Sequence, residues 1–546
     1  MKDKIKTLGS LYINNYVKYS NRPLFYKTPN TYFTYQDLHR LENKYANLIA
    51  DRFRHPVRKK IALILNNSID WVAITQAAHK LDSTVIPINP KLNKETQSYI
   101  LHEVKPDLVF YQSEYEELCK MKKINNHYNI NLNTINYKEI PDLFNYLNWD
   151  VTSEDSGAYI LFTSGTTSNP KGVVLTHKNI LSNLESVQRV FPNYHVKNTD
   201  KYVSFLPWTH CYGLVCELKY MMLNGLSTYI NRNPENLLTD FKTYKPELLC
   251  TVPKLLNKIY NKVHQNNLYH MAKYIYQSDY TLGKDYYNKL LNKLFFGGNL
   301  KKVTVGGASI PEDVIDFYTK MGIQVYQGYG LTETSPMISV NSIYNNRIGS
   351  VGKILDCNEV RISDQNEIIV SGDNVFNGYF NNNSNTGNTS NTGNTGNTSN
   401  NNFEYIDNKR FYHTGDIGKI DKDGYLYITG RLKEIYKLEN GKYIDPCYIE
   451  DRIQQFKGVE QVYVYGADRK YNICLIYGNR RMEKEIFKNI SNLWLMSHID
   501  YYELPKKIFF IDQAFTIDND LLTIKMSLKR DKIYKKYQSE IEELYK

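Results

Sequence analysis

The N-terminal part of the chain alternates between two spacings of apolar residues. Apolar positions three or four residues apart predict helices over 35–53, 68–81 and 179–191. Short unbroken apolar runs predict buried strands over 60–65 and 84–88. Regular alternation of strands and helices is typical of an α/β sheet covered by helices. We therefore predict an α/β fold, whose larger, N-terminal part consists of helix-covered β-sheets.

One segment departs from both spacings. Residues 381–402 are almost wholly Asn, Thr, Ser and Gly. A segment of this composition cannot bury enough apolar surface to fold. Long polar loops also cost a domain little free energy. We interpret the segment as a disordered, functionally neutral insertion at the surface.

The length of 546 residues exceeds that of an ordinary single domain, so we expect more than one domain. The hydrophobic fraction of 42% and the charged fraction of 23% are typical of a soluble globular protein. The basic N-terminus leads into no apolar core of signal-peptide length, and no apolar run is long enough to span a bilayer. We expect a cytoplasmic protein, and peripheral contact with a membrane stays open.

The formal net charge of +11 suits an anionic ligand such as a nucleotide or coenzyme A. The lysines are dispersed along the chain rather than gathered on one arm, so we do not expect nucleic acid as a partner. The seven cysteines include no C-x-x-C pair, which argues against a zinc or redox site. Reduced, mostly buried thiols are the simpler interpretation.

The densest chemical signal lies between two apolar segments, Y-I-L-F and V-V-L. The loop between them reads T-S-G-T-T-S-N-P-K-G, from Thr163 to Gly172. Its small residues let backbone N–H groups approach a polyphosphate, while its hydroxyls and Lys171 add donors and positive charge. The P-loop pattern G-x-x-x-x-G-K-[ST] is absent, and an apolar strand follows instead of a helix. A Ser/Gly-rich surface turn is the plain alternative, which the two flanking buried strands disfavour.

This loop resembles the phosphate loop of the adenylate-forming superfamily, which includes acyl-CoA synthetases, luciferases and the adenylation domains of peptide synthetases. The resemblance continues in order from about Phe33 to nearly the C-terminus. It implies an ATP site, with Mg²⁺, coenzyme A and a carboxylic acid as further small-molecule partners. The loop residues that it assigns to ATP binding are Thr163, Ser164, Gly165, Thr166, Thr167 and Lys171.

Two glycine-containing turns follow predicted strands further along the chain. One reads V-T-V-G-G-A-S and the other reads Q-G-Y-G-L-T-E-T. The resemblance implies that Gly307 and Ala308, which lack bulk, lie flat against adenine. It also implies that Tyr329 stacks on the base. Gln327 and Gly330 belong to the same ATP site by their position in the motif.

The resemblance assigns the reaction chemistry to a few polar residues. Thr332 is expected to donate to a phosphate, and Glu333 to bind Mg²⁺ through a hard carboxylate oxygen. Asp416 is expected to accept hydrogen bonds from both ribose hydroxyls, since a carboxylate has two oxygens. Arg431 is expected to reach the ribose and a phosphate, and Lys433 matches the hinge position of the family.

The resemblance also divides the chain. It predicts an AMP-binding domain over 1–431 and a small, mobile α+β lid domain over 432–546, which rotates between adenylation and thiol attack. His210, in the segment F-L-P-W-T-H-C-Y-G, matches the position beside the acyl pocket. The stretches L-E-N-G-K-Y-I-D-P and L-L-T-I-K-M-S-L-K-R are most similar to long-chain fatty acyl-CoA synthetases. The second stretch leads into an amphipathic helix predicted over 533–545.

One position departs from the family. Adenylate-forming enzymes carry a lysine near the C-terminus that bridges the acyl carboxylate and the α-phosphate. Alignment from both sides puts Ser527 at that position, and serine cannot supply the charge. Lys525 could serve if the loop shifts its register, because a lysine stem is long and flexible, so we name it as the catalytic lysine. Lys529 is the second candidate.

The sequence favours ATP-dependent activation of a fatty, long-chain carboxylic acid as acyl-AMP, followed by transfer to coenzyme A. Three alternatives stay open. The first is a ligase that stops at the adenylate or loads a carrier protein, and the second is a luciferase-like oxygenase. The third is a nucleotide-binding homologue that has lost catalysis, which the serine at position 527 favours.

Overall fold

The fold of the protein comes from a computed structural model. The residues that it describes are 5–112, 115, 127–130, 152–163, 170–191, 201–231, 233–265, 281–380, 402–432, 434–495, 499–516, 518–523 and 527–546. They form two compact units. The first holds the described parts of Met1–Thr163, Pro170–Glu359 and Ser371–Ser399, and the second holds those of Val360–Val370 and Asn400–Lys546. The domain boundary after Arg431 and the mobility of the lid stay predictions.

The Asn-rich insertion falls outside the described residues, apart from Asn402. The Asn402 carbonyl accepts a hydrogen bond from the His413 backbone N–H at 2.9 Å. The chain therefore re-enters regular structure at the end of the polar stretch. The disorder predicted for 381–402 stays a prediction.

The first unit contains a six-stranded sheet in the order β6-β5-β3-β4-β7-β8, in which only β8 runs antiparallel to its neighbour. Its strands are β3 (Lys60–Ile64), β4 (Thr84–Pro87), β5 (Leu108–Tyr111), β6 (His127–Asn129), β7 (Gly157–Thr163) and β8 (Lys171–Thr176). Helix α4 (Lys94–Val104) packs on one face against Ala62 and Ile64. On the other face, the ring of Tyr45 meets that of Phe110 edge-on, with centroids 5.9 Å apart. Burial on both faces explains why β3 and β4 are unbroken apolar runs, as predicted.

The predicted helices begin where side chains cap them. The helices expected over 35–53, 68–81 and 179–191 are confirmed as α2 (Tyr35–Asp51), α3 (Ile69–Lys80) and α6 (His177–Val190), and α1 (Leu8–Tyr19) precedes them. Thr34 and Ser68 each accept a backbone N–H from the third residue of the helix that follows. These N-caps satisfy donors that have no partner within the helix, and so they fix where each helix begins.

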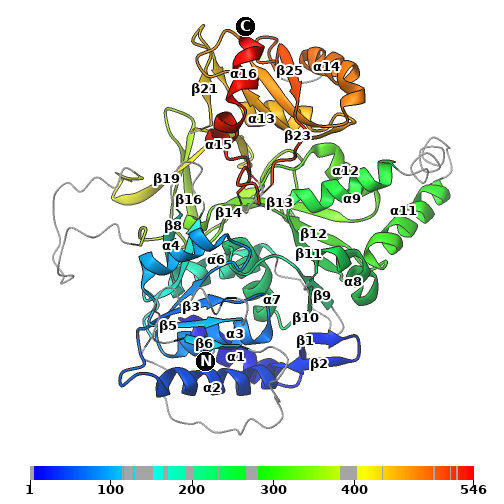
Figure 1. Cartoon of the computed structure of the whole chain (residues 1–546). Coiled ribbons are helices and arrows are strands. Elements are labelled where there is room, and N and C mark those ends of the chain that lie inside the picture. Colours follow the sequence, from blue (N-terminus) through cyan, green and yellow to red (C-terminus); the bar gives the residue numbers. More distant parts are fainter. Residues whose placement is uncertain are drawn as a thin grey trace. The chain divides into compact units, whose positions relative to one another are not determined.

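The first unit also contains a nine-stranded sheet in the order β15-β14-β13-β12-β11-β9-β10-β1-β2 (Figure 1). Its strands are β1 (Pro23–Thr28), β2 (Thr31–Thr34), β9 (Lys201–Ser204), β10 (Ser227–Ile230), β11 (Leu248–Thr251), β12 (Lys302–Val305), β13 (Gln324–Gly330), β14 (Met337–Val340) and β15 (Lys353–Ile354). The strands from β1 to β13 along this order run parallel, whereas β2, β14 and β15 are antiparallel to their neighbours. A parallel sheet brings the carboxyl ends of its strands to one edge, where ligands usually bind.

Helices cover this sheet with one large apolar core. The core residues Phe241, Leu256, Phe296 and Tyr318 come from four different helices and pack against Val303 of β12. The helices of this part are the π-helix η3 (Tyr212–Lys219), α7 (Tyr220–Leu223), η4 (Pro234–Asn236), α8 (Leu237–Tyr244), α9 (Pro253–Gln265), α11 (Thr281–Phe296), α12 (Glu312–Lys320) and the short 3₁₀ turn η5 (Thr332–Thr334). Within the described ranges, no helix combines the length and the apolar character that crossing a lipid bilayer requires.

The second unit is built on smaller sheets. A five-stranded sheet contains β16 (Asn358–Ile362), β17 (Glu367–Gly372), β18 (Phe403–Ile406), β19 (Lys409–Ile420) and β20 (Leu426–Arg431), and β21 (Tyr436–Lys437) pairs with β22 (Tyr443–Ile444). A three-stranded sheet contains β23 (Val459–Tyr465), β24 (Ile473–Gly478) and β25 (Lys507–Phe510). The helices are α13 (Pro446–Ile453), η6 (Arg480–Met482), α14 (Glu483–Ser491), η7 (Leu493–Leu495), α15 (Arg530–Lys536) and α16 (Gln538–Tyr545). Cys474 and Ile476 of β24 face the core with α13 and α14, while Ile473 and Leu475 face the core with α15 and α16.

The amphipathic helix predicted over 533–545 is wrong as a single helix. The segment forms α15 and α16, which are separated at Tyr537 by a non-helical backbone (φ −110°, ψ 24°). Ile533, Tyr537 and Ile541 all enter the same buried cluster. Because one continuous helix would bring the same three side chains to one face, the apolar spacing does not reveal the break at Tyr537.

The packing of α2 on α3 contains a buried ion pair. The Lys80 Nζ lies 2.5 Å from a carboxylate oxygen of Glu42, and both side chains are only 2% exposed. Breaking such a pair by removing one partner leaves an uncompensated buried charge, which typically costs about 3–5 kcal/mol. Replacing both partners by apolar residues is often neutral.

We expect Lys80→Met to lower the thermal unfolding midpoint of the full chain clearly, because the buried Glu42 loses its ammonium partner and keeps only His39, at 3.3 Å. The double variant Lys80→Met/Glu42→Leu should recover most of that loss. Both midpoints are measured by circular dichroism on heating. An equal loss in the single and the double variant would show that packing, rather than charge pairing, holds the two helices together at this point.

Candidate active site

The phosphate loop joins the antiparallel strands β7 and β8. Thr163, the last residue of β7, is paired in register with Lys171, the first residue of β8. This confirms the prediction that a strand, and not a helix, follows the loop. Ser164, Gly165, Thr166 and Thr167 lie outside the described residues, so their assignment to ATP stays a prediction. Lys171 is exposed at the beginning of β8.

The two glycine-containing turns lie at neighbouring strands of the nine-stranded sheet. Strand β12 pairs with β13 so that Val305 is opposite Gln327. Gly307 and Ala308 follow the end of β12 and are exposed, and Gly307 has a left-handed backbone (φ 87°) that favours glycine. The structure therefore places this turn directly beside the β13 residues that the sequence assigns to the same nucleotide.

Tyr329 and Gly330 are half-buried at the carboxyl end of β13. A Cβ atom at position 330 would lie 1.6 Å from the carbonyl oxygen of Pro336. No side chain fits this close approach, so glycine is required there for a backbone reason. The requirement is independent of any role in binding ATP.

Thr332 and Glu333 lie in the 3₁₀ turn η5, immediately after β13. Thr332 is buried, whereas the Glu333 carboxylate is half-buried and accepts a hydrogen bond from the Tyr379 hydroxyl at 3.0 Å. The Lys171 ammonium lies 5.2 Å from the centroid of the Tyr379 ring. Tyr379 therefore contacts both the lysine and the carboxylate that the sequence assigns to phosphate and Mg²⁺.

The residues around Glu333 fit a magnesium ion that is carried by a nucleotide. In the described part of the chain, no group of three or more His, Cys, Asp and Glu side chains could hold a metal by itself. Mg²⁺ at nucleotide sites usually keeps several waters and takes one or two protein carboxylates plus phosphate oxygens. A single half-buried carboxylate near a lysine matches that pattern, and such an ion would neutralise phosphate charge.

Asp416 and Arg431, which the resemblance assigns to the nucleotide, lie in the second unit. They are paired in register on β19 and β20, and the Arg431 Nε lies 3.0 Å from a carboxylate oxygen of the buried Asp416. Two residues that precede Asp416 contact the Glu367 carboxylate of β17. This carboxylate accepts from the Gly415 backbone N–H at 2.8 Å and lies 2.8 Å from the His413 Nδ1. The motif is thus held by hydrogen bonds on both sides. Lys433, the predicted hinge residue, lies outside the described residues.

A buried carboxylate shapes the segment that contains His210. Glu217, in η3, is fully buried and accepts hydrogen bonds from the hydroxyls of Tyr202 and Ser204, the Phe205 N–H and the Trp208 Nε1–H, at 2.7–3.2 Å. Burial raises the pKa of Glu217 to about 7, although these donors act in the opposite direction. The acid therefore fixes the backbone just before His210.

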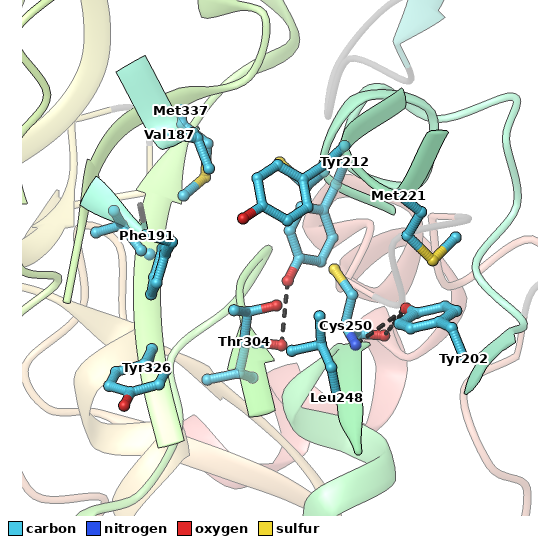
Figure 2. Close-up of a pocket in the computed structure, with 15 residues that line it drawn as sticks. Val187, Phe191, Tyr202, Tyr212, Met221, Leu248, Cys250, Thr304, Tyr326 and Met337 are labelled. Carbon is cyan, nitrogen blue, oxygen red and sulfur yellow. Dashed lines mark hydrogen bonds between the residues drawn. The ribbon is translucent and has the colours of Figure 1, made fainter. Parts of the chain in front are cut away.

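An apolar cavity lies between η3, α6 and the strands β11 to β13, with a volume of about 40 Å³ (Figure 2). The Tyr212 hydroxyl donates to the Thr304 carbonyl at 3.3 Å, so its ring crosses from η3 to β12. His210 is not among the residues that line this cavity, whereas Tyr212 is. The assignment of His210 to the acyl pocket stays a prediction. The lining residues are Val187, Phe191, Tyr202, Tyr212, Cys216, Tyr220, Met221, Leu248, Cys250, Thr304, Val305, Tyr326, Gly328, Met337 and Val340.

Ser527, where the sequence departs from the family, is hydrogen-bonded to Thr523. The Thr523 N–H donates to the Ser527 carbonyl at 2.8 Å, and the Ser527 N–H donates to the Thr523 Oγ1 at 3.2 Å. Lys525 lies outside the described residues. Lys529 forms an ion pair with Asp520, and although partial burial acts in the opposite direction, this pair holds the pKa of Asp520 below its usual value. Of the two candidate lysines, Lys529 is thus paired with an acid.

Sequence reasoning missed two residues that position the site. Tyr379 belongs to the motif G-Y-F just before the Asn-rich insertion, where it served only as a boundary. Glu217 is the one acid in the mostly apolar stretch L-V-C-E-L-K-Y-M-M-L. An acid at such a position predicts a buried carboxylate with hydrogen-bond partners. In both cases the partner is distant in sequence or lies in another element, so a local sequence pattern could not identify that partner.

Solved structures of known proteins share this fold. ATP-bound MatB from Rhodopseudomonas palustris is 19% identical, and the match covers 98% of this chain and 100% of that one, with a TM-score of 0.76. The A-PCP didomain of carboxylic acid reductase from Segniliparus rugosus, in complex with AMP, is 16% identical, with coverage of 100% and 82% and a TM-score of 0.79. This likeness shows the fold, which is that of adenylate-forming enzymes.

Sequence comparisons agree with this class. Long-chain-fatty-acid–CoA ligase 1 of Homo sapiens is 26% identical over 91% of this chain and 80% of its own length. Long chain acyl-CoA synthetase 8 of Arabidopsis thaliana is 25% identical over 90% of this chain and 79% of its own length. The profile of the AMP-binding enzyme family matches residues 14–380. The chain belongs to this family of AMP-binding enzymes.

We expect Lys525→Ala to reduce ATP–pyrophosphate exchange by a factor of about 10²–10³, because loss of one preorganised charge-stabilising donor typically has this effect. Lys529→Ala is the matched control and should retain exchange, since the Lys529 side chain is paired with Asp520. Ser527→Lys, introduced into the Lys525→Ala protein, should restore much of the lost rate. Full activity of Lys525→Ala would show that another group stabilises the α-phosphate.

Proposed function

We propose that the protein activates a fatty, long-chain carboxylic acid with ATP and transfers the acyl group to coenzyme A. The proposal rests on one observation: strands β12 and β13 contribute both to the apolar cavity and to the predicted nucleotide motif. Thr304 and Tyr326 of β12 and β13 line the apolar cavity, and the same strands lead into Ala308 and Tyr329 of the nucleotide motif. An apolar chain in the cavity would therefore present its carboxylate toward the nucleotide residues.

The proposed reaction has two steps. The carboxylate oxygen of the acid attacks the α-phosphorus of ATP, and the bond to the departing pyrophosphate breaks. The thiol sulfur of coenzyme A then attacks the acyl carbon as the thiol loses its proton, and the bond from carbon to the AMP oxygen breaks. The chain's own contribution is positioning and charge stabilisation, to which Lys171, Thr332 and Arg431 would contribute at the phosphates.

The lid and the cofactors are parts of the same proposal. The names of the curated relatives support coenzyme A as the acceptor and a long-chain acid as the substrate. Mg²⁺ would be held by Glu333 with the phosphates of ATP. A rotation about Lys433 would separate the two half-reactions, as in other proteins in which one domain presents two faces.

A second candidate function rests on Ser527. Serine stands where the family has a charged lysine, and this serine is exposed. A protein that binds ATP but does not turn it over would combine this position with an otherwise complete set of nucleotide motifs. Catalysis and binding therefore have to be measured separately.

The decisive experiment is ATP–pyrophosphate exchange by the full chain with short, medium and long fatty acids, followed by acyl transfer to coenzyme A or to a phosphopantetheine carrier protein. We expect exchange that depends on a fatty acid, and thioester formation with free coenzyme A. Exchange without thioester formation would assign the protein to the ligases that stop at the adenylate. ATP binding without exchange for any acid would establish the nucleotide-binding homologue.

We expect Tyr212 to limit the acyl chain length. A cavity of about 40 Å³ holds roughly three waters, so a long chain needs a side chain to move. The Tyr212 ring crosses this space, with Gly306 beside it. Tyr212→Ala should shift the ratio of kcat/KM values toward longer acids by about tenfold or more, which is the scale of discrimination in apolar pockets.

Tyr212→Phe is the control for this variant, because it keeps the ring and removes only the hydrogen bond to Thr304. It should keep the original chain-length preference. Competition between acids of different length in one reaction measures both ratios. An unchanged preference in Tyr212→Ala would mean that the chain takes another path.

A further inference from the structure

The segment from Phe376 to Phe380 connects the two sheets of the first unit. On one side, the Phe376 N–H donates to the Glu333 carbonyl at 2.9 Å. On the other side, the Phe380 N–H donates to the Gly172 carbonyl at 2.7 Å, and the middle of the segment forms an antiparallel bridge with β8. The segment thus fixes the distance between the beginning of β8 and the turn η5.

The side chain of Tyr379 makes a second connection between the same two places. Its hydroxyl donates to the Glu333 carboxylate at 3.0 Å, and its ring lies 5.2 Å from the Lys171 ammonium. Phe376, which is fully buried, packs edge-on against the Tyr379 ring with centroids 4.9 Å apart. The ring is therefore held by a rigid neighbour, and the hydroxyl meets the carboxylate from a fixed direction.

The contact with Tyr379 is compatible with a cation bound by the Glu333 carboxylate. A carboxylate has two oxygens, and the tyrosine hydroxyl engages only one of them, Oε1. Ligating carboxylates depend on such hydrogen bonds for their orientation, and removing the partner typically costs about 10–100-fold in metal affinity. The aromatic face beside Lys171 stabilises an ammonium near the same site without neutralising its charge.

We infer that Tyr379 is a positioning residue, which orients Glu333 toward magnesium and seats Lys171 toward the phosphates of the same nucleotide. The inference rests on the proposed role of Glu333 as the magnesium ligand. Tyr379 would not contact the reacting atoms. Its effect would pass through Glu333 by the hydroxyl and through Lys171 by the ring, and the two effects are separable by mutation.

The test is equilibrium binding of ATP to the full chain by calorimetry, with increasing Mg²⁺ and with EDTA. Tyr379→Phe keeps the ring and removes the hydroxyl. We expect it to raise the Mg²⁺ concentration at half-maximal enhancement of binding by about tenfold or more, with ATP affinity in EDTA unchanged. Tyr379→Leu removes the ring as well, and should also weaken ATP binding in EDTA.

The matched control is Tyr260→Phe. The Tyr260 hydroxyl also donates to a carboxylate at 3.0 Å, that of Asp313, on the helical side of the nine-stranded sheet. The chemical change is identical, and we expect no shift in the Mg²⁺ requirement. Thermal unfolding midpoints of all variants show whether the fold is retained.

Glu333→Gln separates failure of the inference from failure of the proposed site. If this variant loses the Mg²⁺ enhancement and Tyr379→Phe keeps the normal Mg²⁺ requirement, the inference is overturned and the metal site stands. If Glu333→Gln keeps the enhancement, or if the unchanged protein shows none, the proposed metal site is wrong and the inference falls with it. If one of the two Tyr379 variants does not fold, the other Tyr379 variant provides the test.

Discussion

Three buried asparagine side chains hold together the parts of the first unit that carry the candidate site. The Asn183 amide donates to the Met337 carbonyl at 2.8 Å, and the Asn374 amide donates to the Thr334 carbonyl at 2.7 Å. The Asn179 amide donates to two carbonyls of the segment 373–375, at 2.7 and 3.1 Å. Together they connect α6, η5, β14 and the chain before Tyr379.

Such a network is demanding because a buried amide without partners costs free energy. The amide nitrogens of all three asparagines find carbonyl partners, and such fixed partners specify one arrangement instead of a set of similar ones. An apolar interface between the two sheets would tolerate small slides of one against the other. The hydrogen bonds from the amides to the carbonyls do not tolerate such slides, because hydrogen bonds weaken steeply with angle and distance. The position of Glu333 relative to Lys171 is fixed in this way before any ligand binds.

Much of the fold follows from local patterns. The strand over 60–65 and the helix over 68–81 were predictable because their spacing and the N-cap Ser68 act within a few residues. The nucleotide motifs were recognisable in order, and the structure brings Val305, which leads into the turn at Gly307, opposite Gln327 through the pairing of β12 with β13. What could not be predicted depends on partners distant in sequence. Tyr379 and Glu333 are 46 residues apart.

In the C-terminal tail, the sequence similarity to the family does not include the lysine that is expected at position 527. Arg530 donates to both carboxylate oxygens of Glu450, at 2.9 and 2.6 Å, and burial raises the pKa of Glu450 to about 7 although Arg530 acts against this. Leu522 is buried and forms a bridge with Leu528. Leu522 and Arg530, which resemble the family, therefore have structural roles in the second unit. Ser527 is exposed, so packing places no demand on that position.

Each unit holds the carboxylate of its own predicted nucleotide motif through a protein partner. Glu333 accepts from Tyr379 in the first unit, and Asp416 accepts from Arg431 in the second. Because a carboxylate has two oxygens, Glu333 can keep Tyr379 on one oxygen while the other meets a cation. A polar group that already has one fixed partner reorganises little when a ligand arrives, and preorganisation of this kind reduces the cost of binding. The same contacts therefore orient the predicted motifs for a nucleotide.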